Sequence, residues 1–187
     1  MNRLNFKYFL LILLMSLFYS SCTKEVDFNQ VNDLELNPIL ESSLVFFDEP
    51  ASQFVDNGIE VNTIQDFVII DVFNEGFIND NLIKADFVFE YENSIHREFS
   101  LQVDFLDSAD QIQHSFVLTA DASPSNEVLK YQHIEVFDGD KLITFKQTTK
   151  LIFTLTMQPG QSINENSLGK ISLRSKGVFY FNIKDPI

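Results

Sequence analysis

The chain has 187 residues, of which 13 are basic and 27 acidic, and its formal net charge at pH 7 is −14. A chain this acidic repels phosphate backbones and anionic head groups, so we expect neither nucleic-acid binding nor flat adsorption to a membrane. A single cysteine excludes a disulfide within the chain, and the length suits one domain with a tether.

The first predicted element is an export signal over residues 1–21. Arg3 and Lys7 precede an apolar run from Tyr8 to Tyr19. A membrane-spanning helix needs roughly 17 to 25 predominantly apolar residues, so this run is too short to span stably. A basic start followed by a short apolar stretch is typical of a signal peptide that is removed on export.

The residues before the only cysteine indicate where this signal is cut. An ordinary signal peptidase needs a small side chain at the third position before the cut, and Tyr19 stands there for cleavage after Ser21. The stretch ending in Ser21 and Cys22 resembles the lipobox of bacterial lipoproteins, which usually has Leu where this chain has Tyr19. The resemblance implies acylation of Cys22 as the mature N-terminus, and two or more acyl chains anchor a protein stably. The alternative is a free or buried thiol.

The residues after Cys22 bear on the destination. In bacterial lipoproteins an Asp directly after the cysteine is the usual inner-membrane retention signal. Thr23 occupies that position here, so the resemblance implies the outer membrane. Lys24, Glu25 and Asp27 are similar to the charged stretch that sends some Gram-negative lipoproteins to the cell surface. The alternative is that these three residues are ordinary solvated charges of a tether.

After the signal, residues 22–42 read as the lipidated N-terminus and an acidic tether, and residues 43–187 as a single β domain. Short segments rich in β-branched and aromatic residues begin at Leu44, and turn-forming residues separate them. We predict early strands over residues 44–47, 67–73 and 84–91.

The clearest predicted strand lies within residues 97–107. Phe99, Leu101, Val103 and Phe105 alternate with polar residues, which places them on one face of a strand and would scatter them around a helix. Residues 84–91 alternate in the same way. The turn-forming sequence between the two segments predicts that they pair as an antiparallel hairpin.

The second half of the chain continues the strand pattern. We predict strands over residues 112–120, 128–138 and 150–157. In the segment 128–138 the alternation of apolar and polar residues shifts by one position near Gln132 and His133, which predicts a bulge. The segment 138–147 fits either a turn or one short helical turn. Residues 169–184 form either one long strand bent at Gly177 or a tight hairpin across residues 175–177.

Together these segments predict an all-β fold, an antiparallel β-sandwich of immunoglobulin-like architecture. The Cys, Trp and Cys signature of the immunoglobulin family itself is absent. The chain has 20 Phe and no Trp, and we expect most of the Phe side chains to fill the space between the sheets. The functional alternative is an aromatic platform for sugars.

No reaction centre is predicted from the sequence. His96, His114 and His133 form no close-spaced ligand pair, so we expect no metal site, and His114 has the parity of a partly buried strand residue. The acidic loops lack the spacing of a calcium-binding loop. Neither a nucleophile elbow nor a phosphate-binding glycine loop occurs, so we assign no catalytic residue and no cofactor.

The sequence therefore predicts a non-catalytic binding or assembly module in the cell envelope. Its expected partners are the outer membrane, through lipid on Cys22, and an envelope protein or polysaccharide. Two alternatives stay open. One is a hydrolase whose Ser, His and Asp come from distant strands, and the other is a structural pilus or adhesin subunit.

Overall fold

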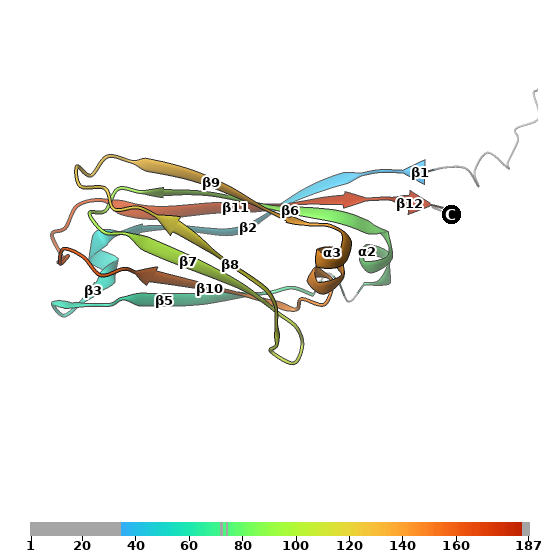
Figure 1. Ribbon diagram of the computed structural model, residues 1–187, viewed down its shortest axis with the longest axis horizontal. Coiled ribbons are helices and arrows are strands. Elements are labelled where there is room, and N and C mark those ends of the chain that lie inside the picture. Colours follow the sequence, from blue (N-terminus) through green and yellow to red (C-terminus); the bar gives the residue numbers. More distant parts are fainter. Residues whose placement is uncertain (1–34, 72, 74, 185–187) are drawn as a thin grey trace, which may run out of the picture. The chain divides into compact units, whose positions relative to one another are not determined.

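The computed structural model describes residues 35–71, 73 and 75–184. Two four-stranded antiparallel sheets face each other (Figure 1). The first sheet has the order β2-β11-β6-β9, with bounds Ile39–Pro50, Lys170–Phe181, Leu82–Asn93 and Leu129–Phe137. The second sheet has the order β5-β10-β7-β8, with bounds Thr63–Ile69, Lys150–Met157, Phe99–Leu106 and Ile112–Ala120.

Smaller elements lie around the two sheets. Strand β1 (Glu35–Leu36) pairs with β12 (Ile183–Lys184), and β3 (Val55–Asp56) pairs with β4 (Ile59–Glu60). A 3-10 helix, η2 (Ala51–Phe54), follows β2, whereas the helices α2 (Gly76–Asn81) and α3 (Gly139–Phe145) lie together at the opposite end of the strands (Figure 1). Within the described ranges, no helix has the length and apolar character needed to cross a bilayer.

The connectivity is that of a jelly roll. Successive strands alternate between the sheets, except that β7 and β8 are neighbours in the second sheet. Two interleaved Greek keys of this kind define the eight-stranded jelly roll. The predicted all-β antiparallel sandwich is confirmed, and its strand order differs from that of an immunoglobulin sandwich.

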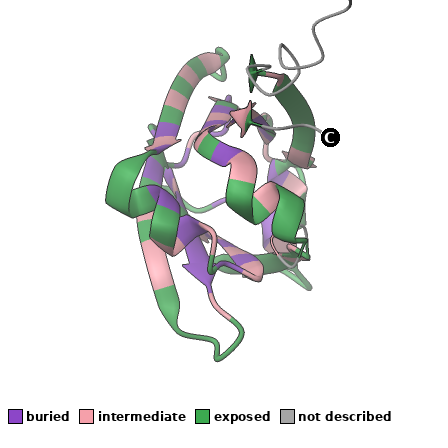
Figure 2. Ribbon diagram, turned by 90° about the vertical axis from the view of Figure 1, so that its right-hand side faces the viewer, coloured by how far each residue is buried: buried purple, intermediate pink, exposed green. Residues whose placement is uncertain are grey.

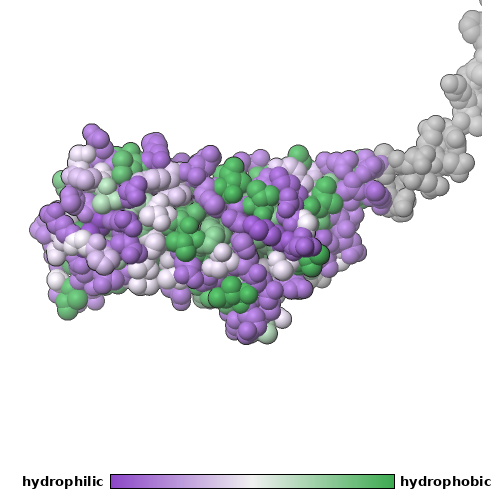
Figure 3. All heavy atoms as spheres, viewed as in Figure 1, coloured by the Kyte–Doolittle hydropathy of each residue, from purple (hydrophilic) through white to green (hydrophobic). Residues whose placement is uncertain are grey.

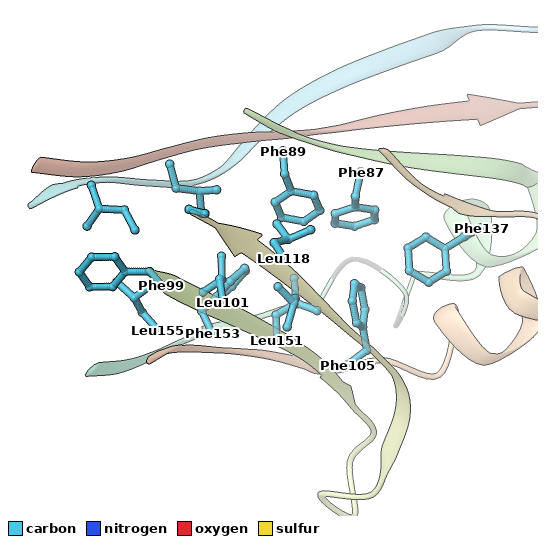
Figure 4. Close-up of a cluster of buried hydrophobic side chains, with 14 of the residues drawn as sticks. Phe87, Phe89, Phe99, Leu101, Phe105, Leu118, Phe137, Leu151, Phe153 and Leu155 are labelled. Carbon is cyan, nitrogen blue, oxygen red and sulfur yellow. The ribbon is translucent and has the colours of Figure 1, made fainter. Parts of the chain in front are cut away.

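The core lies between the sheets, as strand alternation requires. Figure 2, which looks toward the α2–α3 end, shows the buried residues on the inward sides of the strands. Phe87 and Phe89 of the first sheet point toward Phe105 and Leu101 of the second (Figure 4), and the ring centroids of Phe87 and Phe105 are 5.7 Å apart. The largest fully buried side chains are mostly phenylalanines, as the sequence predicts.

The predicted hairpin between residues 84–91 and the strand starting at Phe99 is wrong, because β6 and β7 belong to different sheets. The connection between them crosses the end of the sandwich. Asn93, which is fully buried, donates hydrogen bonds from Nδ2 to the carbonyl oxygens of Arg97 (2.7 Å) and Asp121 (2.8 Å). The first bond satisfies the backbone of the crossing connection, and the second ties this connection to the loop between β8 and β9.

The predicted bulge near Gln132 and His133 is also wrong, because β9 pairs with β6 in unbroken register from Leu129 to Phe137. The apparent change of phase arises because the inward position 135 holds a glutamate, while Ile134 faces outward and is 49% exposed. A polar residue in the core therefore produced the same sequence pattern as an extra residue would.

Two segment boundaries differ from expectation. Strands β1 and β2 begin at Glu35 and Ile39, ahead of residue 43, where the sequence analysis placed the start of the domain. Residues 39–43 are exposed on both faces, so they show no alternation. The predicted strand over 67–73 is shifted, because β5 spans Thr63–Ile69 at the edge of the second sheet, where polar residues are tolerated.

Two open alternatives are settled. The segment after Phe137 forms the short helix α3. Strand β11 is one long strand rather than a hairpin, and its register against β2 shifts between Arg174 and Lys176. At this bulge the Ser175 hydroxyl bonds both the N–H and the carbonyl oxygen of Val45 at 3.0 Å, which satisfies the backbone of β2 there.

Candidate functional site

The site residues predicted from the sequence lie outside the described part of the chain. Ser21 and Cys22, the predicted cleavage and lipidation positions, precede residue 35. So do Lys24, Glu25 and Asp27, the predicted signal for transport to the cell surface. They stay predictions. Within the described residues, the histidines and the two outer sheet faces carry groups that could act chemically or bind a ligand.

Two of the three histidines meet at one buried carboxylate. Glu135 on β9 is 8% exposed, and its oxygens accept hydrogen bonds from the Nε2 atoms of His114 on β8 (2.9 Å) and His133 on β9 (3.1 Å). The Nζ atom of Lys141 lies 3.1 Å from the same carboxylate. This group, which we call the Glu135 cluster, joins the two sheets at the edge formed by β8 and β9.

The Glu135 cluster is electrostatically balanced. Burial raises the pKa of Glu135, but the hydrogen bonds from its three neighbours, together with the positive charge of Lys141, outweigh that effect and hold the pKa below its ordinary value. The carboxylate therefore stays ionised and keeps its donors. Its role is to hold two edge strands together.

A triad and a metal centre both lack candidates in the described ranges. No serine or threonine hydroxyl among residues 35–71, 73 and 75–184 hydrogen-bonds a histidine, and the Nδ1 atom of His96 is buried without a partner there. In the same ranges, no three His, Cys, Asp or Glu side chains are grouped to hold a metal ion. The hydrolase alternative thus has no residues assigned to it.

The outer face of the first sheet is hollowed into a groove of about 610 Å³, which we call the outer-sheet groove. Its residues come from all four strands of the sheet. The groove is lined by Phe46 and Asp48 of β2, Lys170, Ser172 and Arg174 of β11, Glu90, Tyr91 and Glu92 of β6, and Lys130, Tyr131 and Gln132 of β9.

Strand register places four outward side chains in one row across the groove. Arg174 lies opposite Phe46 on one side and Glu90 on the other, and Glu90 lies opposite Gln132. The next row contains Asp48, Ser172, Glu92 and Lys130. Residues directly opposite in antiparallel strands have Cβ atoms about 5 Å apart, so each row is a continuous strip of side chains.

The first row is available to a ligand. Phe46 is 66% exposed, and Arg174, Glu90 and Gln132 form no side-chain hydrogen bond or ion pair with any described residue. The charged side chains of the second row, by contrast, are all paired, Asp48 with the neighbouring Lys170 at 2.8 Å and Glu92 with Lys130 at 3.0 Å. Acidic and basic side chains are equal in number along the groove, so it carries no strong net charge.

The row combines an apolar ring with planar polar groups. The Phe46 ring offers an apolar face, and Arg174 offers a fork of N–H donors. The carboxylate of Glu90 accepts hydrogen bonds, and the amide of Gln132 both donates and accepts them. This arrangement suits a ligand that has apolar faces edged by hydroxyl groups.

No residue of this row was predicted from the sequence. One signal was present, because Phe46 and Phe47 are adjacent in a strand and must point to opposite faces. Phe47 is partly buried against the core, so Phe46 faces outward. The proximity of Arg174 and Glu90 depends on pairing between distant strands, which the local sequence does not reveal.

The second sheet has an outer face of another kind. Its outward side chains mix hydroxyl and amide groups with exposed apolar residues, and several polar groups bond one another, such as Gln65 with Thr154 (2.9 Å) and Gln102 with Asp104 (2.9 Å). Phe67 on β5 is 59% exposed there. Figure 3 views the sandwich from its side instead, where apolar residues form separate patches within a mostly hydrophilic surface.

No protein-family model matches the sequence, and no curated protein matches it. Among solved structures, the VP2 subviral particle of infectious bursal disease virus is similar over 80% of this chain and 33% of its own, with 9% identity and a TM-score of 0.44. The T13 particle of the same virus matches with 12% identity and a TM-score of 0.43, over 80% of this chain and 40% of its own.

A protein named as dimeric latent PorU from Porphyromonas gingivalis is similar over 80% of this chain and 13% of its own, with 11% identity and a TM-score of 0.31. This chain therefore spans less than half the length of each of these similar chains.

Proposed function

We propose that this chain is a lipid-anchored, non-catalytic module of the bacterial outer membrane that binds an envelope polysaccharide along the outer-sheet groove. The anchor is Cys22, and the charged residues Lys24, Glu25 and Asp27 after it direct the module to the cell surface. The observation that carries the binding proposal is the row formed by Phe46, Arg174, Glu90 and Gln132 in a hollowed sheet face.

The dimensions of the groove fit a short segment of a polymer. The row crosses all four strands of the first sheet, which lie about 4.8 Å apart, so it extends over roughly 14 Å. A volume of about 610 Å³ lies within the range of ligand sites, roughly 300–1,000 Å³.

The balance of charge supports a neutral ligand. The acids and bases of the groove offset one another, and a highly acidic chain repels a strongly anionic polymer. A sugar ring has an apolar face that packs on an aromatic ring, and its paired hydroxyl groups match the planar side chains of Arg174 and Glu90. An envelope protein, the other expected partner, would need a larger apolar contact than Phe46 provides.

The experiment measures binding to a panel of neutral oligosaccharides. We use the full chain carrying Cys22→Ala, so that no detergent is needed. Phe46→Ala and Arg174→Ala should each weaken binding about tenfold or more, equivalent to about 1.4 kcal/mol. Phe67→Ala is the matched control, because Phe67 is similarly exposed on an edge strand of the other sheet.

The control should bind with the affinity of the parent protein. Absence of binding to every neutral glycan, or equal losses from Phe46→Ala and Phe67→Ala, would contradict the proposal. A binding loss that follows a lower unfolding temperature would be attributed to folding, so each variant is also melted. Phe46, Arg174 and Phe67 are all mostly exposed, so the three variants are expected to melt within a few degrees of the parent.

A further inference from the structure

The two edges of the sandwich are closed to different degrees. At the β8–β9 edge the Glu135 cluster joins the sheets, and the rings of Phe89 and Phe116 lie 5.4 Å apart. At the β2–β5 edge a cavity of about 510 Å³ opens between the sheets, and we call it the β2–β5 cavity. It is lined by residues of both edge strands and reaches the core phenylalanines Phe87 and Phe145.

Small residues at the inward positions of the first sheet create this space. Ser42 on β2 pairs in register with Gly177 on β11, so neither strand places a large side chain there. The ring of Phe179 lies over Gly177, because a Cβ atom on that glycine would sit 2.7 Å from the Phe179 Cζ atom. Leu40, the next inward residue of β2, is consequently 54% exposed, although it faces the interior of the sandwich.

The walls of the β2–β5 cavity are apolar and fixed. Phe87 packs edge-on against Phe145 (5.2 Å between centroids) and Phe179 (6.1 Å), and Val68 of β5 forms the opposite wall. Both Phe87 and Phe145 are 1% exposed, so packing holds their rings in place. A preformed apolar cavity of this volume is characteristic of small-molecule binding sites.

The rim of the cavity is polar and carries negative charge. Ser42, at an inward position of β2, supplies a hydroxyl group, and Asp71 supplies a carboxylate, whereas Glu41 and Ser43 lie at positions of β2 that alternate toward the outer face. Lys176 pairs with Glu41 at 2.8 Å, whereas Asp71 has no ion pair with a described residue. An anionic head group at this rim would meet Asp71, whereas an uncharged hydroxyl head group would meet hydrogen-bonding partners.

We propose that the β2–β5 cavity binds the apolar body of an uncharged amphiphile, such as a long-chain alcohol, with its hydroxyl head group at the Ser42 side of the rim. This site lies between the sheets, separate from the outer-sheet groove. It therefore adds a second ligand class to the proposed function and does not depend on glycan binding or on the lipid anchor.

The test follows the fluorescence of the neutral apolar probe N-phenyl-1-naphthylamine with the full chain carrying Cys22→Ala, in buffer without detergent. Saturable binding is expected, and 1-dodecanol should displace the probe at lower concentration than dodecanoate does at pH 7. Absence of saturable binding would overturn the site. Displacement by dodecanoate as effective as that by the alcohol would overturn the preference for an uncharged head group.

Two variants place a large side chain in the cavity, and a third serves as the matched control. Ser42→Trp on the exposed edge strand and Val68→Trp on β5 should each reduce probe affinity at least tenfold. Gln65→Trp, on the outward face of β5, should leave it unchanged. Ser42 is solvent-exposed, so its variant is expected to fold, which thermal unfolding checks. Undiminished binding by a folded Ser42→Trp protein would overturn the proposal.

Discussion

Glu135 shows how one buried carboxylate can be stabilised in an apolar core. It is surrounded by His114, His133 and Lys141, which donate to its two oxygens. A buried ionised group is costly unless it is paired and hydrogen-bonded, and here both conditions are met. The same contacts connect β8 to β9, so Glu135 helps to hold the two sheets together at this edge.

We predict that Glu135→Gln lowers the free energy of unfolding at pH 7 by about 1–3 kcal/mol, because charge-assisted hydrogen bonds become neutral ones. The folded pKa of Glu135 lies below its unfolded value, so the stabilisation is fully present above the unfolded pKa and is lost as the pH falls through the folded pKa. Urea unfolding at several pH values should therefore show the parent and the variant converging in acid. A difference that grew in acid would contradict this account.

Gly169 is a second residue whose identity the fold requires. Its φ of +96° lies in the region that favours glycine, and an added Cβ atom would sit 2.2 Å from the carbonyl oxygen of Ser94. Gly169→Ala should cost more than the roughly 1–3 kcal/mol of the backbone conformation alone. Gly58, with a φ of +78° and no atom near its added Cβ, is the matched control. Denaturant unfolding that gave equal losses at both glycines would contradict the close approach.

At the scale of elements, α3 contributes a side chain that closes the end of the core. Phe145 is 1% exposed, and its ring centroid lies 4.6 Å from that of Phe137 and 4.7 Å from that of Phe73. The helix has seven residues and is too short to be stable alone, so tertiary packing holds it in place.

Phe145→Ala should lower the free energy of unfolding by about 3–5 kcal/mol, the usual cost of removing a buried aromatic ring. Ile143→Ala on the same helix removes a side chain that is 60% exposed and should change stability by less than about 0.5 kcal/mol. Chemical denaturation of the two proteins compares them directly. Similar losses would mean that helix propensity, rather than packing of Phe145, holds α3 in place.

Strands with one buried face were predictable, and their partners were not. The alternation from Phe99 to Phe105 and from Leu151 to Met157 predicts β7 and β10 because each has one face in the core. The same local alternation fits a hairpin and a crossing connection equally well. The pairing of β6 with β11 and β9 joins residues far apart in the chain, so the jelly-roll order became visible only in the structure.

The candidate groove shows the same division between local and long-range information. The opposite faces of Phe46 and Phe47 follow from strand geometry, so an exposed aromatic ring near residue 46 was foreseeable. The position of Arg174 beside it depends on the register of β11 against β2. The Glu135 cluster was not predictable from the sequence for a related reason. An inward glutamate is explained only by its hydrogen bond with His114 of the other sheet, and that contact depends on the fold.

At the scale of the whole molecule, the proposed anchor and the proposed binding surfaces serve one role. The chain is too acidic to adhere to an anionic membrane by charge, so the proposed attachment rests on acyl chains at Cys22. The anchor would keep the outer-sheet groove at the surface where envelope polysaccharide is found. The attachment of the module to the outer membrane would then depend on Cys22 alone.

The most direct measurement of this claim is mass spectrometry of the mature N-terminus combined with fractionation of cells. The parent protein should begin at Cys22, carry acyl chains there and sediment with the outer membrane. Cys22→Ala should be unacylated and leave the membrane fraction, whereas Ser20→Ala, the neighbouring control, should behave as the parent does. An unacylated or different mature N-terminus in the parent, or a Cys22→Ala protein that stays in the membrane fraction, would contradict the account.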